Sequence, residues 1–190
     1  MFQKRIIPIL LISNRRGIKS FKFKEKMYLG DPLNIIRIFN EKEVDEFIVI
    51  DADKSIQKQS PDFQFISELS GECFMPLSYG GGIRNLDDAK RIINLGIEKL
   101  SIQSLFFNDR GEFNRIVNYF DSSSVILSID LYEHNKEFYI YDYKTTKFHN
   151  KLDKNFISHL KESRAGEIFF KLVNCDGMKT GLNKILLNKI

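Results

Sequence analysis

Short apolar segments alternate with amphipathic segments along most of the chain. The apolar segments are about five to seven residues long and rich in Ile, Val, Leu and Phe, which is typical of strands buried on both faces of a parallel sheet. We expect strands at residues 5–11, 46–51, 75–80, 99–104, 124–130 and 167–172. The helices expected between them lie at residues 31–43, 61–71, 85–96, 112–120 and 153–166. Single helices between successive strands predict an α/β fold with a parallel sheet and right-handed crossovers.

Residues that start and stop helices support these boundaries. Asp31 is a predicted N-cap, and Pro32 occupies the first helical position after it. Gly71 is the predicted C-cap of the next helix, which begins with another proline. Asn85 and Gly96 bracket the third helix in the same way.

A weak internal repeat indicates how the strands are arranged. The segments EVDEFIVID, GIEKLSIQS and RAGEIFFKL each run from a helix end through charged residues into a strand. They place Glu46, Lys99 and Glu167 at equivalent strand starts, and Arg5 precedes the first strand. A repeated βα unit favours a (β/α)8 TIM barrel over a doubly wound sheet, and no GxGxxG turn follows the first strand. In a barrel these four charged side chains would meet around the axis, as a structural ion-pair lid or as a gate for a small neutral molecule.

Two insertions follow strands and would therefore lie at the C-terminal mouth, where barrel active sites are found. Residues 12–30 contain alternating Phe and Lys with Gly17 at a predicted turn, which favours a hairpin. Residues 131–150 contain an alternating strand flanked by the turn segments HN and KTTK.

Composition narrows the class of protein. The chain has 190 residues, 43% of them hydrophobic, which suits a single domain. Its net charge is only +4 and Lys and Glu are interleaved, so no basic stripe points to nucleic acid. No apolar run approaches the ~20 residues of a membrane span, and the apolar stretch within the start, MFQKRIIPIL, is too short for a signal peptide. Cys73 and Cys175 have no CxxC partner, and His134, His149 and His159 lack ligand spacing, so we expect a reduced, cytoplasmic chain without metal or cofactor.

Gly80, Gly81 and Gly82 directly follow a predicted strand and precede a helix. Glycines there let the backbone approach an anion, and the helix start directs N–H groups toward it. Ser104 adds a hydroxyl after the next strand. These residues form a candidate phosphate cradle, although a tight βα turn that needs positive φ would explain the glycines equally well.

Carboxylates also gather at the predicted mouth, where they could act as acid, base or hydroxyl ligand, or serve only as helix caps. The aspartates concerned are Asp51, Asp53, Asp130 and Asp176. Asp130 is the strongest candidate because it closes a well-defined strand and leads into the second insertion. Asp176 and Gly177 form a turn that could grip a substrate. Lys19 could pair with an anionic substrate, although an exposed lysine is the more common explanation.

Several segments together resemble the cyclase subunit of imidazole glycerol phosphate synthase (HisF type), namely KRII, GDP, VDE, GGGI, EKLSI, SID, AGEI and DGMKTG. That family is a (β/α)8 barrel that receives ammonia from a glutaminase docked on its N-terminal face and cyclises a bisphosphorylated ribonucleotide at the other face. The resemblance implies that Gly81, Gly82 and Ser104 bind phosphate and that Asp130 is catalytic. It places Lys19, Asp51, Asp176 and Gly177 near the substrate. It also implies that the ammonia gate consists of Arg5, Glu46, Lys99 and Glu167.

Two features depart from the family pattern. Leu11 stands where the family has its other catalytic aspartate, and a leucine can neither donate nor accept a proton; such a loss costs roughly 10²–10⁴-fold in rate. The chain looks more like a divergent branch implicated, with a glutaminase and an amidotransferase, in making acetamidino sugars of surface polysaccharides. The second departure is length, since a barrel needs about 250 residues. We expect strands seven and eight to be absent, leaving about six, because of a fragment or a truncated gene rather than a second polypeptide that completes the barrel.

Three functional hypotheses remain open. The first is an ammonia-accepting scaffold for a sugar amidotransferase, with little cyclase activity. The second is an authentic cyclase, a lyase of histidine biosynthesis, in which Asp53 stands in for the carboxylate missing at position 11. The third is an inactive stub without a partner.

Overall fold

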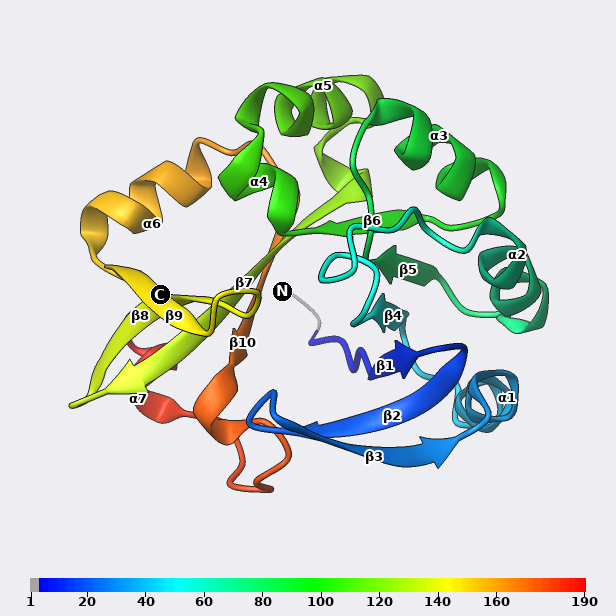
Figure 1. Ribbon diagram of the computed structural model, residues 1–190, viewed down its shortest axis with the longest axis horizontal. Helices are drawn as coiled ribbons and strands as arrows, with labels where there is room; N and C mark the ends of the chain where they lie inside the picture. Colours follow the sequence, from blue (N-terminus) through cyan, green and yellow to red (C-terminus); the bar gives the residue numbers. More distant parts are fainter. Residues whose placement is uncertain (1–3) are drawn as a thin grey trace.

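The computed structural model describes residues 4–190, and its strands form one ten-stranded sheet that curves around a central space (Figure 1). Neighbouring parallel strands in this sheet are β1 (Ile9–Ser13), β4 (Phe47–Asp51), β5 (Leu77–Gly80), β6 (Lys99–Ile102), β7 (Val125–His134) and β10 (Glu167–Leu172). The expected α/β fold with a mostly parallel sheet is confirmed, and its curvature is that of a partial (β/α)8 barrel.

Helices cover the outer side of the curved sheet (Figure 1). They are α1 (Pro32–Glu41), α2 (Phe63–Glu72), α3 (Leu86–Asn94), α4 (Ser104–Asn108), α5 (Arg110–Phe120), α6 (Lys154–Lys161) and α7 (Lys184–Leu187). The predicted N-caps of α1 and α3 are confirmed, because Asp31 accepts from the Asn34 amide and Asn85 from the Asp88 amide. Outward strand residues bury against this layer; the Phe47 ring, for example, lies 5.1 Å from that of Phe39 in α1.

Several helix boundaries differ from the sequence prediction, and one helix was not predicted. Gly71 lies inside α2 rather than at its C-cap, and the N-cap is Asp62, whose side chain accepts from the Phe65 amide. The short helix α4 was not expected: the chain turns into a helix at Ser104, directly after β6. Helix α6 ends at Lys161 instead of 166, ahead of the left-handed φ of 59° at Arg164.

The first insertion forms the predicted hairpin, made of β2 (Arg16–Phe21) and β3 (Glu25–Gly30). Its first turn is wrongly predicted, however, since Asn14 and Arg15 carry the positive φ values of 50° and 60°. Gly17 lies within β2, where a Cβ would come within 2.8 Å of the Gly30 carbonyl oxygen. The glycine therefore serves the close approach of two strands rather than the turn.

The second insertion extends β7 and adds two antiparallel strands, β8 (Glu137–Asp142) and β9 (Lys147–Lys151). Turns at residues 135–136 and 143–146 match the predicted HN and KTTK segments. Single 3-10 turns, η1 (Ser122–Ser124) and η2 (Val173–Cys175), precede β7 and follow β10. Within residues 4–190, no helix has the length and apolar character needed to cross a bilayer.

Candidate functional site

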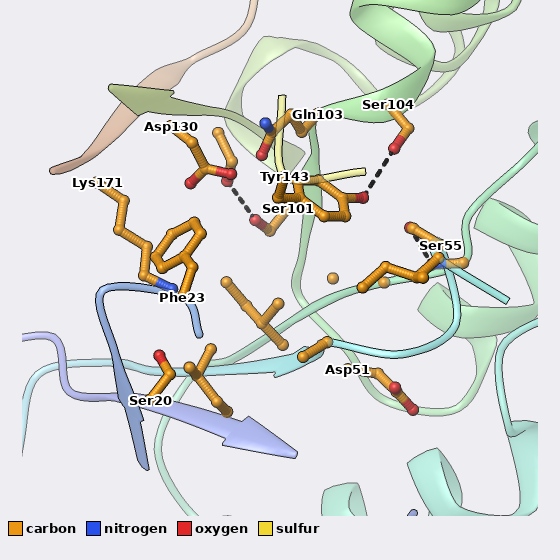
Figure 2. Close-up of a pocket in the computed structure, with 18 of the residues that line it drawn as sticks. Ser20, Phe23, Asp51, Ser55, Ser101, Gln103, Ser104, Asp130, Tyr143 and Lys171 are labelled. Atoms are coloured by element: carbon orange, nitrogen blue, oxygen red, sulfur yellow. Dashed lines mark hydrogen bonds between the residues drawn. The ribbon is translucent and has the colours of Figure 1, made fainter. Parts of the chain in front are cut away.

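A cavity opens at the carboxyl ends of the parallel strands, with the two insertions forming part of its wall (Figure 2). Alternate residues of each strand face inward, so each strand contributes one row of side chains. Strand residues that line the cavity include Leu11, Ile50, Ser101, Ser128, Asp130, Phe169 and Lys171. Loops and hairpins add Phe23, Lys26, Ser55, Gly81, Gly82, Gln103, Ser104 and Tyr143.

Asp130 is the most strongly perturbed acid in this cavity. Only 6% of the residue is exposed, and burial raises the pKa of its carboxyl to about 6, with Asp142 and Asp176 adding to the effect. The positive charge of Lys171 and a hydrogen bond from Gln103 oppose that rise. Asp130 therefore exchanges a proton near neutral pH, as a general acid or base must.

This titration predicts a pH-dependent stability. The pKa of Asp130 is about 6 in the folded chain and about 3.9 when unfolded, so the folded state holds more protons between these values. The free energy of unfolding should fall as pH rises from about 4 to about 6, by about 2–3 kcal/mol in total, and stay low above that range. Urea unfolding across this range, compared with Asp130→Asn, isolates the carboxyl because asparagine has the same shape and does not titrate. A difference between the two chains that is the same at every pH would contradict the raised pKa.

Leu11 contributes an apolar side chain to the same cavity as Asp130. In the sheet it pairs with Ile18 of β2 and Ile50 of β4, which both line the cavity as well. Without a carboxylate at this strand end, the cavity has a hydrocarbon patch formed by Leu11, Ile18 and Ile50.

The two aspartates that follow β4 take different roles. Asp51 lines the cavity, and its Oδ1 accepts from the amides of Asp53 at 3.1 Å and Lys54 at 3.3 Å. Burial raises the pKa of the Asp51 carboxyl. Asp53 is not among the lining residues; it accepts from the Ser13 hydroxyl and pairs with Lys26 at 2.6 Å. The Asp53 carboxylate is thus already paired with Lys26, and it does not line the cavity.

The predicted phosphate residues come together on one wall. Gly81 has a φ of 114°, and a Cβ there would lie 2.4 Å from the Asp51 carbonyl oxygen, so only glycine fits. The Gly82 amide donates to the Ser55 hydroxyl at 3.1 Å, and Ser104 bonds the Tyr143 hydroxyl at 3.2 Å. The backbone turn alone therefore requires glycine at these positions. Phosphate binding stays a prediction.

Three residues predicted near the substrate lie off the cavity wall. The Lys19 ammonium lies 5.2 Å from the centre of the Phe21 ring, on the face of β2 opposite the lining residues Ile18 and Ser20. Asp176 accepts from the Ser20 hydroxyl, and its carbonyl accepts from the Lys22 amide at 3.0 Å. Gly177 has a φ of 74°, and a Cβ there would meet the Ser20 carbonyl oxygen at 2.5 Å. Asp176 and Gly177 thus hold the hairpin beside the cavity, and their contact with a substrate stays a prediction.

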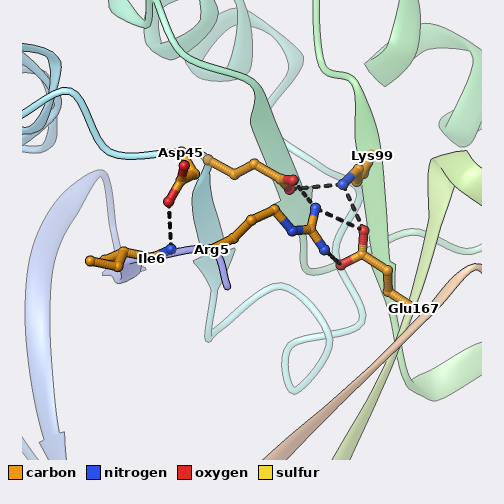
Figure 3. Close-up of polar contacts among 6 residues, drawn as sticks. Arg5, Ile6, Asp45, Lys99 and Glu167 are labelled. Carbon is orange, nitrogen blue, oxygen red and sulfur yellow. Dashed lines mark hydrogen bonds and ion pairs between the residues drawn. The ribbon is translucent and has the colours of Figure 1, made fainter. Parts of the chain in front are cut away.

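The four charged residues predicted from the repeat form a ring where the strands begin (Figure 3). Arg5 pairs with Glu46 and lies 3.2 Å from Glu167. Lys99 Nζ bridges Glu46 at 2.8 Å and Glu167 at 2.7 Å. The structure thus brings these groups together, as expected from their equivalent places in the βα repeat.

The ring neutralises itself although part of it is buried. The side chains of Glu46 and Lys99 are only 8% and 16% exposed. Burial opposes the charge of Lys99, but the two carboxylates outweigh it and raise the pKa of the ammonium. Burial likewise opposes ionisation of Glu167, yet Lys99 and Arg5 lower its pKa. The charges of Lys99 and Glu167 are therefore maintained by their partners, and the four side chains of the ring depend on one another for solvation.

Sequence reasoning missed Lys26, Phe23, Tyr143 and Lys171 in the cavity. The first three come from the insertions, where strand alternation alone does not tell which face turns inward. Lys171 could have been found, because it lies four residues after the ring residue Glu167 on the same face of one strand.

Comparison with known proteins identifies the family. Residues 5–190 match the family described as "Histidine biosynthesis protein". The chain belongs to the HisF-type imidazole glycerol phosphate synthase subunits. It is 41% identical to the "Putative imidazole glycerol phosphate synthase subunit hisF2" of Pseudomonas aeruginosa, over all of this chain and 76% of that protein. It is 37% identical to the "Putative imidazole glycerol phosphate synthase subunit HisF" of Leptospira interrogans, over all of this chain and 75% of that protein. Against the "Imidazole glycerol phosphate synthase subunit HisF" of an Exiguobacterium species it is 26% identical, over all of this chain and 74% of that protein.

The match to the HisF-type family includes both ends of the strands. The cavity around Asp130 and the ring of Arg5, Glu46, Lys99 and Glu167 all fall within residues 5–190. Both features are therefore parts of one HisF-type fold rather than separate additions.

Proposed function

We propose that this chain is an ammonia-accepting HisF-like subunit that pairs with a glutaminase and serves a sugar amidotransferase in acetamidino modification of surface polysaccharides. The observation that carries the proposal is that Leu11, and no second carboxylate, occupies position 11 of the cavity that holds Asp130. Cyclisation needs a pair of proton-transferring groups, and a leucine removes one of them. A subunit that has kept its ammonia entrance while losing half of that pair suits delivery better than cyclisation.

The charged ring supports the ammonia part of the proposal. Its two cations and two anions compensate one another, so an ion gains little by entering, whereas neutral ammonia can exchange hydrogen bonds with the carboxylates. Above the ring, the hydroxyls of Ser101 and Ser128 lie 2.6 Å apart inside the barrel. Both also line the cavity, which places hydrogen-bonding groups between the ring and the site.

An authentic cyclase is the second candidate function, and the names of the relatives favour it. It requires a carboxylate to replace the one missing at position 11. Asp53 is poorly placed for that role because it does not line the cavity and already binds Ser13 and Lys26. Asp51 lines the cavity, so it is the better stand-in, although two backbone amides already occupy one of its oxygens.

A direct assay separates these candidates. Purified chain is given the bisphosphorylated ribonucleotide with an ammonium salt, and cyclisation is compared with that of the Exiguobacterium HisF. We expect the rate to be lower by roughly 10²–10⁴-fold. In parallel, a HisH-type glutaminase should bind the chain and hydrolyse glutamine faster in its presence. A cyclisation rate equal to that of the Exiguobacterium HisF would favour the histidine-pathway enzyme. A low rate together with no binding of a glutaminase would favour the hypothesis of an inactive chain without a partner.

A further inference from the structure

Lys171 and Asp130 occupy paired positions on neighbouring strands, β10 and β7, at the wall of the cavity. Figure 2 shows the Lys171 side chain starting near Asp130 and running away from that carboxyl toward Phe23. Its ammonium nitrogen lies 4.2 Å from the centre of that ring. The Phe23 ring therefore lies against the amine, and Phe169, two residues earlier in β10, also lines the cavity.

Lys99 pairs with Glu46 and Glu167, whereas Lys171 forms no ion pair among residues 4–190. Among residues 4–190, the lysines that form ion pairs are Lys26, Lys99, Lys151 and Lys189. Lys171 is not one of them, although Asp130 and Asp176 are its nearest negative charges. Burial lowers the pKa of Lys171 and outweighs the attraction of both carboxylates. A lysine in this condition holds more neutral amine at pH 7 than an exposed lysine, and the neutral amine is the nucleophile.

We propose that Lys171 is a nucleophile that forms an imine with the aldehyde or ketone carbon of a small hydroxylated substrate bound in this cavity, with Asp130 as its proton donor and acceptor. The amine nitrogen attacks the carbonyl carbon, and the electron pair of the C=O π bond moves to oxygen. Protonated Asp130 donates its proton to that oxygen and takes the excess proton from the nitrogen, which gives a neutral carbinolamine and restores the protonated acid. Protonation of that hydroxyl by Asp130 releases water as the C=N bond forms. The step needs no oxidant or reductant, and it is reversible. It goes beyond ammonia delivery and does not depend on a glutaminase partner.

The remaining polar groups of the cavity suit a hydroxylated carbonyl compound. The Ser101–Ser128 hydroxyl pair and the Gln103 amide lie on the same wall as Asp130 and offer donors and acceptors for substrate hydroxyls. Lys26 also lines the cavity, but its nitrogen is held in an ion pair by Asp53 at 2.6 Å. The two cavity lysines are thus a matched pair that differs in ion pairing.

Reductive trapping tests the proposal on the intact chain. The chain is incubated with glyceraldehyde and limiting cyanoborohydride at neutral pH, and adducts on each lysine are quantified by peptide mass spectrometry. The lowered pKa of Lys171 gives its amine a larger neutral fraction, so we expect Lys171 to be modified measurably faster than Lys26 or Lys19. Because all lysines compete within one folded chain, this comparison needs no variant.

Two variants assign the mechanism. Lys171→Met should abolish the fast adduct and leave labelling of Lys26 unchanged, whereas Lys26→Met should leave the Lys171 adduct in place. Asp130→Asn should slow trapping at Lys171 by about tenfold or more, if a positioned acid assists loss of water, while circular dichroism confirms the fold. Labelling of Lys171 no faster than that of Lys26 or Lys19 would overturn the proposal, and an unchanged rate in Asp130→Asn would remove Asp130 from it.

Discussion

Leu11→Asp is expected to raise ammonia-dependent cyclisation of the bisphosphorylated ribonucleotide by roughly 10²–10⁴-fold over the parent chain. Position 11 and Asp130 line one cavity, so the substitution puts a second carboxyl where a proton donor or acceptor is missing. Lys26 and Lys171 line the same cavity and favour the ionised form of the new group. The readout is product formation under saturating ammonium salt, which avoids any need for a glutaminase.

Leu11→Asn is the matched control, because it introduces the same volume and polarity without a titratable proton. It should remain near the rate of the parent chain. Equal gains from asparagine and aspartate would show that polarity rather than proton transfer limits the reaction. A parent chain that already cyclises at ordinary rates, with little gain from aspartate, would instead support the cyclase and its stand-in carboxylate Asp51.

Lys99→Glu is expected to destabilise the fold by about 3–5 kcal/mol, as when a buried ion pair loses one partner. The substitution sets three carboxylates at the strand starts with Arg5 as the remaining cation of the ring. Glu46 is the most costly of these, since its side chain is only 8% exposed and Lys99 holds its Oε2 at 2.8 Å. The same variant should lose any stimulation of glutaminase activity. Urea unfolding at neutral pH and low salt measures the first effect.

Two controls separate the buried ring from surface electrostatics. Lys99→Met removes the charge without adding a repulsion, so its loss of stability should be smaller. Arg37→Glu reverses an exposed cation of α1 whose pair with Glu72 is 2.8 Å long, and should cost much less stability than Lys99→Glu. Equal losses from Lys99→Glu and Arg37→Glu would show that the ring contributes no more than a surface ion pair.

Much of this barrel could be predicted because its strands, helix caps and charged ring depend on local or periodic sequence patterns. Runs of β-branched and aromatic residues mark β4 and β7, and side-chain caps at Asp31 and Asn85 mark helix starts. The ring was predictable for the same reason: Glu46, Lys99 and Glu167 recur at one place in a repeated unit, and parallel strands bring such places to one end of the sheet.

The predictions failed where a local signal had two explanations. Gly17 looked like a turn residue, but the contact that requires it is with Gly30, thirteen positions away in the sequence, across the β2–β3 pair. Gly71 looked like a helix cap, yet α2 continues through it to Glu72. Ser104 was expected to end a strand and instead begins α4. In each case the residue type alone indicated a turn, a helix end or a strand end, and the surrounding structure placed the residue differently.

By itself, the amino-acid sequence determined the order of strands and helices, the gathering of four charges at the strand starts, and the leucine at position 11. These depend on periodicity and on which residue occupies a place in a repeating unit. Only the tertiary structure decided that Asp53 is tied to Lys26 outside the cavity, that Lys19 faces away, and that Lys171 enters beside Asp130 without an ion pair. Those outcomes depend on hairpin register and on the burial of one charge by residues from other strands, and neither quantity is encoded in any single segment.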